Sequence, residues 1–142
     1  MTIDDDERER FDELLEEELD RLPARLKRML DETPLIVEDA PSRKLLRELG
    51  LDPDEDDLCG LHSGVALTER SVTDRPEIPD RIEIFRRGII DEAGGWEPWV
   101  DDDGTELGGE QSVRREIRIT ILHEIGHHYG LSEEDLERLG YA

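Results

Sequence analysis

Two histidines and a glutamate near residue 125 have the spacing of a zinc-binding helix. His123, Glu124 and His127 form the pattern H-E-x-x-H. Side chains four residues apart on a helix lie on the same face, one turn from each other. His123 and His127 can therefore supply two neighbouring ligands of a tetrahedral Zn²⁺. Glu124 lies beside the first ligand, where a carboxylate can take a proton from metal-bound water, as in metalloproteases.

Two ordinary surface histidines are the alternative interpretation of this pattern. With four His in 142 residues, a second His four positions on arises by chance in roughly 2% of cases. Apolar residues recur every four positions along the same segment, at Val113, Ile117, Ile121 and Ile125. This stripe predicts a helix with one buried side, and the two histidines lie off its middle. We therefore expect a zinc site.

The third zinc ligand is expected just after the motif helix, which is the predicted helix that carries His123, Glu124 and His127. Gly130 permits a left-handed helix end, so the chain can turn sharply back toward the metal. Glu133 stands six residues after His127, where metzincins carry their third ligand, and its carboxylate is our first choice. Two features differ from metzincins, because the third ligand is not His and no Met follows to form a Met-turn.

Other roles compete for these residues. One alternative is that Ser132 caps a short helix over residues 133–139, and that Glu133 and Glu134 merely complement the positive end of that helix. Asp135 is the second candidate for the third ligand, and His62 is the third.

With these residues in view, the chain resembles the small bacterial zincin-like metallopeptidases, sometimes called minimal zincins. Their signature is H-E-x-x-H-x-x-G-x-x followed by Asp or Ser. Four residues match it directly: His123, Glu124, His127 and Gly130. Glu133 occupies the acidic position with one more methylene. Similar stretches also occur at residues 36–41, 60–71 and 139–140, so the resemblance covers most of the chain. It implies a zincin-like fold and peptidase activity, without specifying a substrate.

Length and composition indicate one small acidic domain over residues 1–142. The net charge of −22 argues against nucleic acid or an anionic membrane as a partner, because both would be repelled. The chain shows no signal-peptide pattern and no long apolar run, so we expect a cytoplasmic protein. Cys59 is the only cysteine, which excludes an intramolecular disulfide and a Cys-rich zinc site, and we expect it to be buried.

Hydrophobic spacing predicts the elements that position the motif. Apolar residues three and four apart predict one or two helices over residues 5–31, divided at Pro23. Further elements are a strand at 35–37, a helix at 42–49 ending at Gly50, and a loop with a short strand at 58–67. The metal-bearing helix comes after the strands. Together they predict an α+β fold with a small mixed sheet and N-terminal helices.

Residues 81–86 alternate polar and apolar side chains, which predicts a half-buried strand. The zincin resemblance implies that this strand forms the edge of the sheet beside the zinc. There its backbone would bind an extended substrate as a further strand.

A Gly-rich acidic loop is expected at residues 94–111, with Trp96 and Trp99. Its acidic residues partly fit a calcium-binding EF-hand loop, but Trp99 occupies the first ligand position, so we expect a solvated loop. One hypothesis is that Trp96 or Trp99 packs over the active-site cleft and shapes substrate access.

The sequence therefore predicts a zinc metallopeptidase that acts on peptide or protein substrates. Zinc would lower the pKa of a bound water to about 7, and Glu124 would take its proton and pass it to the leaving amine. Two other classes compete with this function. They are a catalytically silent zinc-binding or interaction domain on the same scaffold, and another kind of zinc hydrolase.

Overall fold

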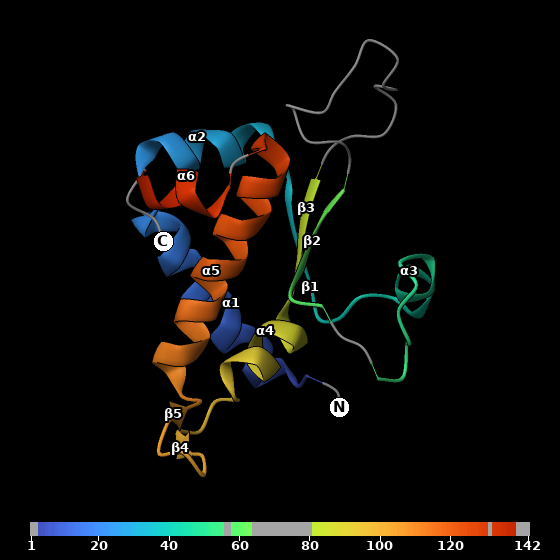
Figure 1. Cartoon of the computed structure of the whole chain (residues 1–142), viewed down its shortest axis with the longest axis vertical. Helices are drawn as coiled ribbons and strands as arrows, with labels where there is room; N and C mark the ends of the chain where they lie inside the picture. Colours follow the sequence, from blue (N-terminus) through green and yellow to red (C-terminus); the bar gives the residue numbers. More distant parts are fainter. Residues whose placement is uncertain (1–2, 56–57, 64–80, 131, 139–142) are drawn as a thin grey trace.

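The computed structural model describes residues 3–55, 58–63, 81–130 and 132–138 (Figure 1). Its elements in chain order are α1 (Asp5–Arg21), α2 (Ala24–Glu32), β1 (Leu35–Glu38), α3 (Arg43–Glu48), β2 (Gly60–Ser63), β3 (Arg81–Phe85), α4 (Arg86–Ala93), β4 (Trp99–Val100), β5 (Glu106–Leu107), α5 (Glu110–Tyr129) and α6 (Glu133–Arg138). Helices combined with two small sheets confirm the α+β class. Within the described ranges, no helix is long and apolar enough to cross a lipid bilayer.

The main sheet has the strand order β1-β3-β2. β3 pairs in parallel with β1 and antiparallel with β2, so the sheet is mixed, as expected. The expectation that residues 81–86 form the edge strand is wrong, because β3 lies in the middle. Of the strands that the structure describes, β2 is the edge strand that packs against α5. The alternation of polar and apolar side chains indicates which residues face each side of the sheet, but it carries no information on which strands pair beside it.

β3 is also more deeply buried than its alternation suggested. Ile82 and Ile84 lie in the core, as the pattern predicts. Glu83 between them is only 7% exposed and forms an ion pair with Arg81 at 2.8 Å. The second face of β3 is therefore covered at Glu83, and the carboxylate of Glu83 lies beside a guanidinium.

α5 is the central helix, and it packs against α1, α4 and both β2 and β3 (Figure 1). Its predicted apolar stripe is confirmed, because Val113, Ile117, Ile121 and Ile125 are at most 1% exposed. α1 contributes Phe11, Leu14 and Leu15 to the same core cluster. Burial of one such side chain contributes about 1.5–3 kcal/mol, so this contact fixes the motif helix firmly.

Charged groups also join α1 to α5. Arg114 Nη1 lies 2.6 Å from Glu17 Oε2 and 3.7 Å from Glu18 Oε1. Glu18 is itself buried, and Arg21 lies 3.6 Å from the same oxygen. Opposite charges around a buried carboxylate offset the cost of removing it from water.

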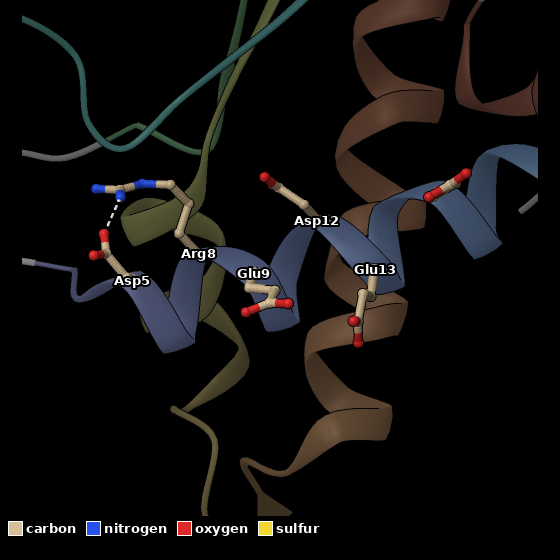
Figure 2. A pocket seen from close by; sticks show the side chains of 6 residues that line it. Asp5, Arg8, Glu9, Asp12 and Glu13 are labelled. Carbon is tan, nitrogen blue, oxygen red and sulfur yellow. Dashed lines mark hydrogen bonds and ion pairs between the residues drawn. The ribbon is translucent and has the colours of Figure 1, made fainter.

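The outer face of α1 is acidic and forms a shallow hollow (Figure 2). The residues along this face are Asp5, Arg8, Glu9, Asp12, Glu13 and Glu16. Arg8 is the only cation among them, and it forms ion pairs with Asp5 at 2.7 Å and with Asp39, beyond the end of β1, at 2.6 Å. The hollow is therefore a solvated charged surface that α1 presents away from the core.

Arg86 extends this set of ion pairs to the start of α4. Its guanidinium donates hydrogen bonds to Asp12 on α1 and to Asp39 Oδ1, at 2.9 and 2.8 Å. The Arg86 side chain is only 11% exposed. Arg86 therefore holds the junction of β3 and α4 against both α1 and the segment that follows β1.

Local signals set most helix ends as expected. Pro23 separates α1 from α2 and occupies the N-cap of α2. Ser42 caps α3 by accepting a hydrogen bond from the Leu45 N–H, and Gly50 after that helix has a φ of 79°. α4 was not predicted, because β3 passes directly into it at Phe85 without a loop or a side-chain cap.

Candidate metal centre

The predicted zinc-binding pair lies on one continuous helix. α5 runs from Glu110 to Tyr129 without a break, so His123 and His127 are one helical turn apart along it. The His123 side chain is exposed. The side chain of His127 lies outside the described residues. The backbone therefore has the spacing that two zinc ligands require.

Glu124 has a different environment from its neighbour His123. It is only 7% exposed, on the side of α5 that faces β2. A Cβ atom built on Gly60, at the start of β2, would lie 3.1 Å from Glu124 Cγ and 3.2 Å from Glu124 Oε1. The same atom would lie 2.9 Å from Cγ2 of Thr120, one turn earlier on α5. Glu124 therefore packs directly on the backbone of the edge strand.

One further carboxylate of α5, that of Glu116, precedes the motif. Burial is the main cause that raises the pKa of Glu116, and the Glu92 carboxylate raises it further. Arg115 and His123 oppose this rise. Glu116 is therefore close enough to His123 for their charges to interact.

The chain turns back after α5 as expected. Gly130 has a φ of 68°, which confirms the predicted left-handed helix end. α6 then begins at Glu133 and packs against α5. The backbone of Glu133 is thus in the first turn of a helix that follows the reversal, while its side chain lies outside the described residues.

Ser132 and Asp135 form a capping box at the start of α6. Ser132 Oγ accepts a hydrogen bond from the Asp135 N–H at 3.1 Å, and Asp135 Oδ2 accepts one from the Ser132 N–H at 2.9 Å. The hydrogen bond from the Ser132 backbone is the main cause that lowers the pKa of Asp135. Capping of a short helix by Ser132 is therefore confirmed, and Asp135 has a structural role in that cap. These hydrogen bonds do not involve Glu133.

The other predicted ligands are placed only in part. His62 lies in β2 opposite Ile82 of β3, and its side chain is outside the described residues. Within the part of the chain that the structure describes, no three His, Cys, Asp or Glu side chains converge as a metal site. Of the three predicted ligands, His123 alone has a described side chain. The helix spacing, the exposed imidazole and the reversal at Gly130 fit a zinc ion.

The hypothesis that a tryptophan packs over the cleft is wrong. Trp96 packs against the core, and the Arg10 guanidinium lies 4.4 Å from the centre of its ring. Trp99 donates a hydrogen bond from Nε1 to Gly94 O at 2.8 Å. Both precede α5, and the β4–β5 hairpin lies at the opposite end of α5 from α6 (Figure 1). Nearness in sequence to a long helix did not indicate which end of it they contact.

The acidic loop around Asp101 is a hairpin turn. Asp101 Oδ1 accepts hydrogen bonds from the N–H groups of Asp103 and Thr105, each at 2.9 Å. This carboxylate stabilises the turn between β4 and β5, in line with the expectation of a solvated loop.

Sequence reasoning missed Gly60 as a site residue. A glycine inside a strand often marks a close approach of another chain segment, so the signal was present. The preceding Cys59 is half-buried rather than fully buried, and its thiol donates to Gly88 O at 3.4 Å. The segment that carries Gly60 is therefore fixed on the α4 side as well as on the α5 side.

Comparison with known proteins agrees with this geometry. A family model described as zincin-like metallopeptidase matches residues 30–141. A search of curated proteins gave no match. The matched range contains the motif helix, the three-stranded sheet and α6, whereas α1 precedes it.

Proposed function

The chain belongs to the zincin-like metallopeptidase family, and on this basis we propose that it is a zinc-dependent peptidase with Glu124 as its general base. The main support is the position of Glu124, which is 7% exposed on the motif helix beside the exposed His123. Its side chain packs on the backbone of β2, and the predicted ligand His123 directly precedes it in the chain.

His123, His127 and Glu133 would hold the zinc ion. When bound, zinc polarises the scissile carbonyl and activates a water molecule. Glu124 accepts the proton of that water and transfers it to the leaving nitrogen. Because Glu124 packs on β2, the proton is moved next to the edge strand of the sheet.

Peptides or proteins are the proposed substrates. β2, rather than β3, is the strand along which an extended substrate would bind by adding a further strand. Its position against Glu124 supports this role. Nucleic acid and anionic membranes are excluded from the proposal by the net charge of −22.

Metal content is the first test. The purified chain should contain close to one zinc ion, and His127→Ala should lose it. His128→Ala is the matched control, since residue 128 is rotated by about 100° from residue 127 on a helix and should leave zinc bound. Absence of zinc after incubation with the metal would contradict the proposal.

Glu124→Gln then separates a peptidase from a silent zinc-binding domain. The variant should bind zinc like the wild type and should lose hydrolysis of a peptide library, because glutamine cannot accept the proton. Retained turnover would show that Glu124 is not the base. A zinc-loaded wild type that cleaves no peptide would favour the silent domain.

A further inference from the structure

We propose that Gly60 is a positioning residue for Glu124, and that the absence of a side chain at residue 60 sets where the carboxylate stands. This inference rests on the proposed function and extends it to a residue outside the metal-binding motif. A glycine here lets the backbone of β2 approach α5 closely enough to touch the Glu124 side chain.

β2 cannot retreat from α5 at this point. Gly60 is paired with Ile84 of the central strand, and the N–H of Phe85 donates to the carbonyl of Cys59 at 2.9 Å. Behind it, a Cβ atom on Gly88 of α4 would lie only 2.0 Å from the carbonyl oxygen of Leu58. The segment that leads into β2 is thus enclosed between β3, α4 and α5.

α5 cannot retreat from β2 either. Ile117, Ile121 and Ile125 are buried in the core on the same helix, so moving the helix would disturb all of them. Thr120 and Glu124 are 6% and 7% exposed and stand one turn apart against Gly60. Because both backbones are fixed, the side chains of Thr120 and Glu124 must absorb any added volume at residue 60.

Gly60→Ala should therefore displace the carboxylate by a few tenths of an ångström. The new Cβ would press on Thr120 Cγ2 and on Glu124 Cγ and Oε1, at 2.9, 3.1 and 3.2 Å before any shift. A catalytic group misplaced by about 1 Å can cost about 100-fold in rate. For the smaller shift expected here, we expect kcat to fall by about tenfold.

The double variant Gly60→Ala/Thr120→Ser separates positioning from stability. Serine removes the methyl group that would lie 2.9 Å from the new Cβ, but the contacts with Glu124 persist. We expect the double variant to recover most of the melting temperature lost by Gly60→Ala. Its kcat at saturating zinc should stay about tenfold below that of the Thr120→Ser single variant.

Zinc affinity completes the test. Affinity for zinc should stay unchanged, because the contacts of Gly60 are with Glu124 and Thr120.

Recovery of kcat together with the melting temperature in the double variant would overturn the proposal, because Gly60 would then act through stability alone. Loss of zinc would overturn it as well, by showing that the disturbance reaches the metal. An inactive zinc-loaded wild type would refute the proposed function and this inference together. The wild-type assay alone identifies that outcome.

Discussion

Gly88→Ala tests the packing that holds the site in place. Two physical effects of this substitution change the stability of the fold in opposite directions, so the sign of the measured change shows which effect is larger. Gly88 is buried within α4. In a helix interior, alanine is favoured over glycine by about 0.5–1 kcal/mol, so helix propensity alone predicts a more stable protein. The tertiary contacts predict the reverse. A Cβ atom at this position would lie 2.0 Å from Leu58 O, 2.6 Å from Leu58 C and 3.1 Å from Cys59 N.

The size of the expected stability loss follows from those distances. Ordinary carbon–oxygen contacts begin at about 3.3 Å, so α4 and the backbone at Leu58 would have to separate by roughly 1 Å. Overpacking of a core costs about 1–3 kcal/mol. We expect a cost at the upper end of this range, because the obstructing atoms are backbone atoms that cannot change rotamer. After the gain in helix propensity is subtracted, we expect a net loss of about 2 kcal/mol.

Urea unfolding measures this loss directly. The midpoint should fall with little change in the slope, and the melting temperature should fall by roughly 6–8 °C. Glu92→Ala is the control, because residue 92 is exposed on the same helix and its stability should stay within about 0.5 kcal/mol of the wild type. A Gly88→Ala protein as stable as the wild type, or more stable, would refute the packing argument.

Three further predictions concern the helix after the motif, acid stability and the third ligand. Ser132→Ala removes the acceptor for the Asp135 N–H and should cost α6 about 1 kcal/mol, seen as faster amide exchange in α6 alone. The hydrogen bond from Arg8 is the main cause that lowers the pKa of Asp39 below 3.8. Above pH 3.8, this ion pair contributes its full stabilisation of the fold, and the contribution is lost as the pH falls through the lower pKa of Asp39 in the folded protein. The Asp39→Asn variant should therefore lose less stability on acidification than the wild type, as measured by urea unfolding at each pH. Glu133→Ala should weaken zinc binding by at least about tenfold in a chelator competition, and unchanged affinity would assign that ligand to another residue.

Local signals in the sequence were sufficient for the helices that carry the motif. The four-residue recurrence of apolar side chains placed α5 and its buried side correctly. Gly130 and Pro23 marked the ends of helices, because each restricts or permits a backbone conformation by its own covalent structure. These effects act within a few residues, so they can be read without the rest of the fold.

The arrangement of the strands could not be predicted in the same way. Whether β3 is central or at the edge depends on β1 and β2, which pair with it from distant parts of the chain. The burial of Glu83 depends on that pairing too. Glu124 lies more than sixty residues after Gly60 in the chain, so the glycine can signal a close approach but no local pattern specifies which residue approaches it.

The packing of α1 on α5 affects where this chain can be shortened. The family match begins at residue 30 and so leaves out α1 and most of α2. Phe11, Leu14 and Leu15 nevertheless belong to the core that covers the motif helix. A fragment trimmed to the matched range would expose that apolar surface to water and would be prone to aggregate. The sequence shared with the family is therefore smaller than the unit that folds, and truncated forms should retain α1 together with its N-cap Asp4 and Ile3, which also packs against the core.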